Sequence, residues 1–156
     1  MIDTPTVVQT ERRTTAVIHL TIPVADMPKL FGPAVMELLA ELKEQGVLPA
    51  GPLVAHHFNL SGPDFTTFDF ELGFPVDAPV RANGRVKPSE LPSVRALRTN
   101  YHGAYEGLPG AWGEFQAWIA ASGHAQGPSL FESYVLGPAN SPDPSTWQTE
   151  LTRFLA

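Results

Sequence analysis

Cysteine is absent from the 156 residues, and its absence excludes disulfide bonds, thiolate metal sites, iron–sulfur clusters and cysteine nucleophiles. Basic residues are scarce: ten Lys and Arg stand against sixteen Asp and Glu, so the net charge is −6. Because a duplex binder needs a basic face, direct nucleic-acid binding is not expected. No apolar run reaches the about 18 residues that cross a bilayer, and the polar N-terminus has no signal-peptide core. These absences predict a cytoplasmic protein without a membrane segment.

What the chain does contain is typical of a folded domain. Apolar residues make up 43% of the sequence, and 16 prolines and 13 glycines fall between apolar runs, as turn residues do. The length predicts one domain, at residues 15–156, after a loose or edge segment at residues 1–14.

Hydrophobic spacing predicts the elements of this domain. A β-branched run predicts a strand at residues 15–22. Leu30, Ala34, Leu38 and Leu42 recur at helical spacing and predict a helix from Met27 to Gln45, with Asp26 as N-cap and Gly46 after its end. Further elements are expected as strands at 53–60, 66–76, 94–102, 129–136 and 146–155, a helix at 111–122, a turn at 61–64, and a short strand at 81–86 in the connection 77–92.

An internal repeat underlies the predicted fold. ELLAELKEQG (37–46) aligns with EFQAWIAASG (114–123), Gly51-Pro52 with Gly127-Pro128, and residues 66–72 with 145–151. In this register His56 matches Glu132, Phe58 matches Tyr134, and Glu71 matches Glu150. We therefore expect an α+β fold of tandem β-α-β-β repeats, at about 15–76 and 94–155, with pseudo-two-fold symmetry. The sheet is expected to be mainly antiparallel, with two helices and a central ligand cleft.

Glu132 is the first candidate site residue. It lies in the apolar run LFESYVL, where a carboxylate is costly unless it is paired, hydrogen-bonded or lines a cavity. Strand alternation puts Tyr134 on the same face. Glu132 is thus a candidate for cation recognition, or for a raised pKa and acid–base chemistry. A solvated strand face, or a pair with an Arg, is an equally open interpretation.

Glu150 is the second candidate, and the repeat relates it to Glu71, for which a solvated position is the stronger alternative. Aromatic residues are spread over the elements around the expected cleft: Phe58, Tyr101, Tyr105, Trp112, Trp118, Tyr134 and Trp147. Aromatic rings with one or two carboxylates suit flat, lipophilic cations, because stacking and cation–π contacts add to charge complementarity. Core packing is the alternative, and we expect it for Trp118 on the helix stripe.

No metal, cofactor or catalytic motif is recognisable. His56 and His57 are adjacent on a predicted strand, so their rings point to opposite faces and cannot readily chelate one metal. We expect no metal and no cofactor, and we keep His56 as a cleft residue because the repeat matches it to Glu132. The sequence has no GxSxG, P-loop, Rossmann or kinase motif.

Several motifs occur in a fairly specific order: FDFELGFPV (68–76), HGAYEGL (102–108), the helix reaching Trp118, ESY (132–134) before Pro138, and DPSTWQTEL (143–151). In this order they resemble the GyrI-like small-molecule-binding domain, the effector-binding end of many AraC- and MerR-type regulators. The resemblance covers about residues 15–155. It implies two β-α-β-β units with a ligand groove along the pseudo-two-fold axis.

The resemblance also implies roles for individual residues. In multidrug-sensing members, a glutamate on the matching strand meets cationic ligands in an aromatic pocket, and Glu132 has that position here, with Tyr134 two residues on. The resemblance places Glu150 and Tyr105 near the same pocket and Trp112 as a pocket wall. The expected binding set is Glu132, Tyr134, Glu150, Tyr105, Trp112, His56, Phe58, Glu71 and Trp147.

Three functions follow from the resemblance. The favoured one is a stand-alone protein that captures lipophilic aromatic, cationic compounds in a multidrug-type pocket, and we expect it to lack a DNA-binding domain because only about 14 polar residues precede the first strand. The second is a hydrolase of cyclopropane-bearing genotoxic natural products, in which Glu132, Glu150 and Tyr134 have suitable chemistry. The third is a protein-interaction role such as gyrase inhibition. No motif specifies an oligomeric state.

Overall fold

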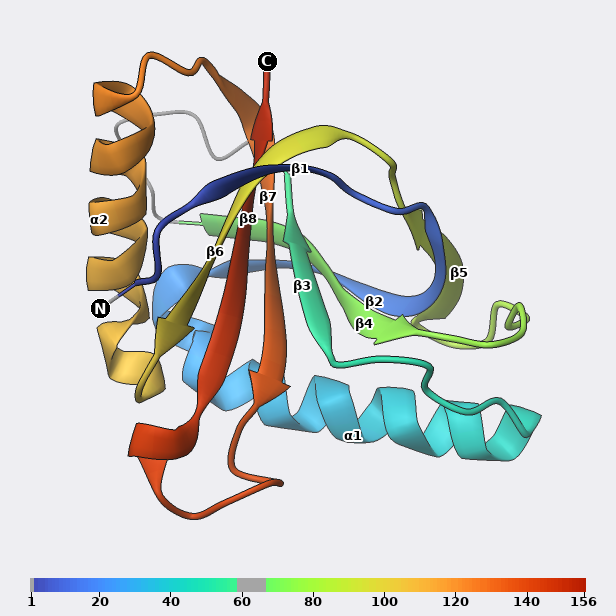
Figure 1. Cartoon of the computed structure of the whole chain (residues 1–156). Helices are drawn as coiled ribbons and strands as arrows, with labels where there is room; N and C mark the ends of the chain where they lie inside the picture. The colour runs from blue at the N-terminus through green and yellow to red at the C-terminus, as the bar shows by residue number, and fades with distance from the viewer. Residues whose placement is uncertain (1, 59–66) are drawn as a thin grey trace. The chain divides into compact units, whose positions relative to one another are not determined.

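The computed structural model describes residues 2–58 and 67–156. The chain divides into two compact units. Unit 1 consists of Met1–Thr10 and Ser93–Ala156, and unit 2 consists of Glu11–Pro92. Unit 1 therefore takes both ends of the chain, which are blue and red in Figure 1, and unit 2 takes the stretch between them. Both units are built from antiparallel strands and one α-helix each, which together give the predicted α+β class.

Unit 2 is a four-stranded antiparallel arrangement with one long helix. Its strands follow the order β3-β4-β2-β5. Its elements are β2 (Arg13–Pro23), the 3-10 helix η1 (Val24–Asp26), α1 (Met27–Gln45), β3 (Val54–His57), β4 (Thr67–Pro75) and β5 (Val86–Leu91). The short strand predicted at 81–86 is misplaced, because the strand of this connection, β5, begins only at Val86 and continues to Leu91. The predicted turn at 61–64 and the end of the strand predicted at 53–60 lie outside the described residues.

The two faces of the unit 2 strands differ sharply in polarity. Ile18 and Leu20 on β2 lie opposite Leu72 and Phe70 on β4, and all four are buried. The alternate positions place His19 opposite Glu71, on a face that keeps polar side chains partly in solvent. Period-two alternation produces this division, as expected for an antiparallel sheet with one buried side. We call these sides the apolar face and the polar face of unit 2.

Helix α1 has the predicted boundaries, Met27 to Gln45. Gly46 ends it in the left-handed conformation, with φ of 67°, which glycine adopts without a Cβ penalty. Asp26 precedes the helix, but its side chain makes no capping hydrogen bond. Leu30 is 40% exposed although it shares the helical spacing of the buried residues, so the buried stripe starts one turn later, at Ala34.

Unit 1 has the same kind of arrangement, in the strand order β1-β6-β8-β7, all antiparallel. Its elements are β1 (Thr6–Gln9), β6 (Arg95–His102), η2 (Tyr105–Gly107), α2 (Leu108–Ala121), β7 (Gln126–Leu136), η3 (Pro144–Thr146) and β8 (Gln148–Leu155). The predicted edge segment at the N-terminus thus supplies an edge strand to this unit.

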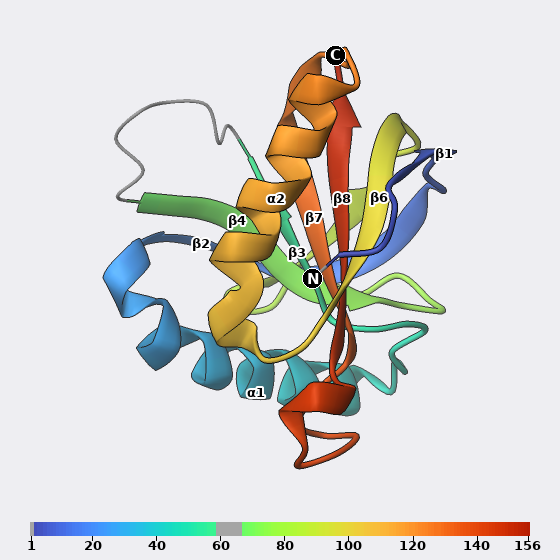
Figure 2. The ribbon, with the colours of Figure 1, turned by 60° about the vertical axis from the view of Figure 1, so that its left-hand side comes forward.

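Helix α2 covers one face of the unit 1 strands, as the turned view in Figure 2 shows. Its buried residues Leu108, Ala111, Phe115 and Ile119 pack with residues of β6 and with Leu151 of β8. The helix begins at Leu108, three residues before the predicted start. We call the covered side the helix face of unit 1. Among the described residues, neither helix combines the length and the apolar character that a bilayer crossing requires.

The predicted repeat is confirmed as a repeat of topology, but one part of its register is wrong. Glu71 lies opposite His56 on β3, and Glu150 lies opposite Ser133 on β7. His56 is therefore the positional equivalent of Ser133 and not of Glu132. The pairing of β7 with β8 shifts between Gln126 and Leu130, next to the Gly-Pro pair used for the alignment. The alignment was therefore off by one residue at His56, and a one-residue slip exchanges the two faces of a strand.

Candidate ligand-binding site

A carboxylate with two neutral donors lies on the helix face of unit 1. Glu132 is on β7, opposite the buried Leu151 of β8. The Trp112 indole Nε1–H, from α2, donates to Glu132 Oε1 over 2.8 Å. The Tyr134 hydroxyl, two residues along β7, donates to Glu132 Oε2 over 2.8 Å. Each carboxylate oxygen is therefore held by a donor from a different element, and these two residues are its only partners among the described residues.

Burial sets the protonation of this group. Burial raises the pKa of Glu132, while the hydrogen bonds from Tyr134 and Trp112 oppose that rise because they favour the carboxylate. Burial also raises the pKa of Tyr134 well above its ordinary value, and the charge of Glu132 adds to that rise. Tyr134 therefore remains a protonated donor at neutral pH. Two neutral dipoles hold this group, and no cation among the described residues forms an ion pair with it.

Aromatic rings lie beside this carboxylate. The Tyr105 and Tyr134 rings meet in a T-shaped contact with centroids 5.8 Å apart, and Tyr105 lies 5.0 Å from the Trp147 indole. Burial, and then the charge of Glu132, raises the pKa of Tyr105. We call Glu132, Tyr134, Trp112, Tyr105 and Trp147 the Glu132 cluster. The structure brings these five predicted residues together within unit 1.

Local backbone features hold Tyr105 in the cluster. Gly103 has φ of 140°, a conformation that other residues rarely adopt, and it turns the chain from β6 into η2. The Tyr101 hydroxyl donates a hydrogen bond of 2.7 Å to the Ala104 carbonyl, which stabilises this turn. A Cβ at Gly137 would lie 2.5 Å from the Tyr105 hydroxyl, so glycine is needed there for the ring to fit.

Trp147 is positioned by the short helix η3. The Asp143 carboxylate accepts a hydrogen bond from the Ser145 amide over 3.0 Å and so caps η3. The Trp147 indole N–H donates to the Ser141 carbonyl over 2.9 Å. The polar edge of the indole is therefore satisfied inside its own loop, which leaves the ring surface as the part that contacts Tyr105.

Glu150 does not join the cluster, contrary to the prediction. It lies opposite Ser133 on β7, whereas Glu132 lies opposite Leu151, so the two glutamates point to opposite faces of the unit 1 strands. Glu150 Oε1 is 3.3 Å from Arg98 Nε on the neighbouring strand β6. The arginine pair that the sequence left open for Glu132 is found instead at Glu150.

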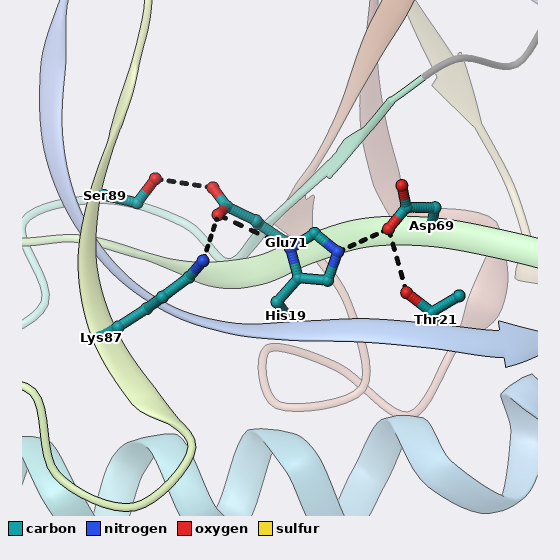
Figure 3. Close-up of polar contacts among 6 residues, drawn as sticks. All are labelled: His19, Thr21, Asp69, Glu71, Lys87 and Ser89. Carbon is teal, nitrogen blue, oxygen red and sulfur yellow. Dashed lines mark hydrogen bonds and ion pairs between the residues drawn. The ribbon is translucent and has the colours of Figure 1, made fainter.

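Glu71 belongs to a separate network on the polar face of unit 2, shown in Figure 3. Its Oε1 accepts from the Ser89 hydroxyl over 2.6 Å, and its Oε2 lies 3.3 Å from Lys87 Nζ and 3.8 Å from His19 Nδ1. The other imidazole nitrogen of His19 contacts Asp69. This network contains its own cationic group, so Glu71 is charge-compensated within the unit.

His56 and Phe58 also belong to unit 2. His56 lies opposite Glu71 and its ring centroid is 4.2 Å from that of Phe58. Burial lowers the pKa of His56 to about 4, against the opposing effect of Glu71, so the imidazole is neutral at neutral pH. The assignment of His56 as the counterpart of Glu132 rested on the shifted register and is wrong. Whether His56, Phe58 or Glu71 contacts a ligand remains a prediction.

Arg153 is a charged residue that the sequence reading overlooked. It is 6% exposed and lies on β8 opposite Leu130, on the same face as Leu151. Its signal in the sequence is its spacing, because in TELTRFL it alternates with Leu151 and Leu155 and therefore falls at an inward position.

The described residues contain no group of three or more His, Asp or Glu arranged to hold a metal ion. The chemistry of the Glu132 cluster is instead that of a charged acceptor beside aromatic surface. Such a group can attract a cation or exchange a proton.

The fold is shared with several solved structures. The C-terminal domain of EcmrR has a TM-score of 0.84 at 18% identity, over 98% of this chain and 97% of that chain. In the EcmrR–DNA complex the TM-score is 0.82 at 19% identity, and the match covers 97% of this chain but only 57% of that one. A hydrolase from Listeria innocua matches with a TM-score of 0.69 at 12% identity, covering 97% and 91%. SAV2435 bound to tetraphenylphosphonium matches with a TM-score of 0.72 at 12% identity, covering 99% and 94%.

No curated protein matches this sequence. A model of one domain family does match, over residues 3–152, which is nearly the whole chain and includes every member of the Glu132 cluster. Together with the repeated topology and the resemblance of the motifs, this match identifies the chain as a member of the family of GyrI-like small-molecule-binding domains.

Proposed function

We propose that this protein captures lipophilic aromatic cations at the Glu132 cluster. The observation that carries the proposal is the carboxylate of Glu132, which two neutral donors hold but no cation compensates among the described residues. Burying an uncompensated charge is unfavourable, so a bound cation would recover part of that cost. The adjacent rings of Tyr105, Tyr134 and Trp147 supply stacking and cation–π surface.

The geometry favours a delocalised cation over a compact ammonium. Trp112 and Tyr134 each occupy one carboxylate oxygen of Glu132, which leaves fewer free positions for the directed N–H donors of a lysine-like group. A cation with spread charge and aromatic substituents needs only electrostatic attraction and ring contacts. Tetraphenylphosphonium is such an ion, and the structurally similar SAV2435 binds it.

A catalytic role has less support. The hydrolase interpretation relied on Glu132 and Glu150 acting together, but these residues point to opposite faces of the unit 1 strands. Glu132 with a raised pKa and Tyr134 as a donor remain available for acid–base chemistry. Multiple turnover of an electrophilic cyclopropane substrate would establish hydrolysis, whereas stoichiometric binding without product would count against it.

The deciding experiment is calorimetric titration of the protein with tetraphenylphosphonium, comparing wild type with Glu132→Gln. We expect micromolar binding by the wild type and a loss of at least about tenfold in the variant, because glutamine keeps the shape but removes the charge. Glu150→Gln is the matched control, since it removes a carboxylate from the other face of the same strands, and its affinity should stay within about twofold. Equal binding by wild type and Glu132→Gln would refute the proposal.

A further inference from the structure

A second uncompensated charge lies on the helix face of unit 1, and its sign is opposite to that of Glu132. Arg153 is 6% exposed, and its Nη2 donates to the Gly127 carbonyl over 2.9 Å. Its Nε–H is buried and has no hydrogen-bond partner among the described residues, and no carboxylate there pairs with the guanidinium. Burial lowers the pKa of Arg153. One explanation for a buried polar group without a partner is that an anionic ligand binds to it.

Glu132 and Arg153 share one face but do not pair with each other. Glu132 lies opposite Leu151, and Arg153 lies two residues further along β8, opposite Leu130. Two residues of a strand span about 7 Å, so the two positions are neighbours on the same surface. Their side chains diverge, because Arg153 reaches to Gly127 near the start of β7 whereas Glu132 bonds Tyr134 further along that strand.

We propose that Arg153 binds a carboxylate of the ligand, so that the ligand class is an aromatic zwitterion with its cationic part at Glu132 and its carboxylate at Arg153. This inference rests on the proposed function of the Glu132 cluster. Guanidinium is suited to the task because its planar fork of donors matches a carboxylate and holds it by charge-assisted hydrogen bonds. A ligand with both charges would compensate both buried groups at once, which a simple cation cannot do.

The competing explanation is that Arg153 only supports the backbone of β7. The register of β7 shifts between Gln126 and Leu130, and the carbonyl that Arg153 bonds belongs to Gly127 in that irregular stretch. One neutral donor would be enough for this bond, so the backbone role explains neither the charge nor the unused Nε–H. Arg153→Gln separates the two roles, because an amide can still donate a hydrogen bond but carries no charge.

The test uses two fluorescent probes that differ in one group: the cationic methyl ester of a rhodamine and the corresponding free acid, which is a zwitterion. Fluorescence anisotropy at neutral pH gives the dissociation constant of each probe. We expect wild type to bind the acid at least as tightly as the ester. In Arg153→Gln the acid should lose about tenfold relative to the ester, as expected for one charge-assisted contact. Arg98→Gln is the control, because Arg98 pairs with Glu150 on the other face, and its ratio of affinities should match wild type.

The ester serves as the internal standard for folding, because any loss of structure weakens both probes. If the ester binds through Glu132 but the ratio of affinities is unchanged in Arg153→Gln, the inference fails and the proposed function stands. If wild type already binds the ester more than tenfold tighter than the acid, the inference also fails, without any variant at Arg153. If neither probe binds wild type, both proposals fail.

Discussion

The two units share a topology, but two equivalent positions on β7 and β3 carry side chains of different chemistry. In unit 1, the helix-face positions of β7 carry Glu132 and Tyr134, opposite Leu151 and Thr149. The equivalent positions of β3 in unit 2, opposite Leu72 and Phe70, carry Ala55 and His57. The His57 ring stacks on Phe70 with centroids 4.8 Å apart, and burial lowers its pKa to about 4. Unit 1 therefore places a glutamate where unit 2 has Ala55, and a tyrosine where unit 2 has the neutral, packed imidazole of His57.

The glutamates that the two units have in common differ from Glu132, because each is paired with a cation. Glu71 and Glu150 occupy equivalent positions, and each lies 3.3 Å from a cation: Lys87 on β5, the next strand but one, for Glu71, and Arg98 on the adjacent strand β6 for Glu150. The repeated glutamates are therefore the compensated ones, and the uncompensated glutamate has no counterpart in the other unit. In this protein the glutamates that the repeat preserves form ion pairs, and the glutamate that the repeat does not preserve, Glu132, belongs to the candidate site.

The largest effect that would sharpen this comparison is the pH dependence of cation binding. Because burial raises the pKa of Glu132, a proton competes with tetraphenylphosphonium at a higher pH than it would at an ordinary glutamate, near about 4.3. The affinity should fall roughly tenfold for each pH unit below the pKa of Glu132. Calorimetric titrations over a pH series measure this, and Glu132→Gln should give a flat profile. Parallel profiles for both proteins would place the titrating group elsewhere.

A smaller effect concerns the stability of the protein in acid. The pKa of His57 is depressed from 6.5 to about 4 in the folded protein, so the unfolded chain binds more protons between these values and stability falls as the pH drops through this window. Between about pH 7 and pH 5 the free energy of unfolding should fall by about 2 kcal/mol on account of this one residue. Over the same pH interval, the free energy of unfolding of His57→Phe should fall by about 2 kcal/mol less than that of the wild type. Urea unfolding of both proteins at both pH values measures this difference. Equal losses would mean that the imidazole is not held neutral.

The smallest effect tests the compensated acids. Glu71→Gln and Glu150→Gln should each lower the free energy of unfolding by less than about 1 kcal/mol, because partly exposed ion pairs contribute little. A double-mutant cycle of Glu150→Gln with Arg98→Gln isolates the pair energy. A loss of several kcal/mol at either glutamate would break the distinction between the two kinds of acid.

Most of the fold was predictable because its signals are local. The spacing of Ala34, Leu38 and Leu42 indicated the buried stripe of α1, and Gly46 indicated its end. The alternation of apolar and acidic residues in FDFEL (68–72) likewise agrees with the two faces of β4. The short strand within the 77–92 connection was predicted too early, at 81–86, because the pattern there is interrupted by proline and glycine and the strand is defined by its pairing with β2.

The candidate site was predictable only in part. A glutamate inside an apolar run indicated Glu132 directly, since that environment is costly for a charge. The assignments of Glu150 and His56 depended on which strand face each residue occupies, and an alignment that was off by one residue placed His56 on the wrong face. Arg153 was not predicted as a site residue, because the feature that singles it out is a buried Nε–H without a hydrogen-bond partner among the described residues. The sequence does not show this feature, since it depends on how the strands pair.

The edge strand β1 has a consequence for how the protein is made. It pairs with β6, and these strands are separated in the chain by the whole of unit 2. Unit 2 is continuous and can complete its contacts while synthesis is still in progress, whereas unit 1 must wait for its last strand, β8. The Glu132 cluster, which includes Trp147 just before β8, is thus among the last parts of the molecule to form. A chain truncated before this point would contain all of unit 2 but would lack Trp147 and strand β8.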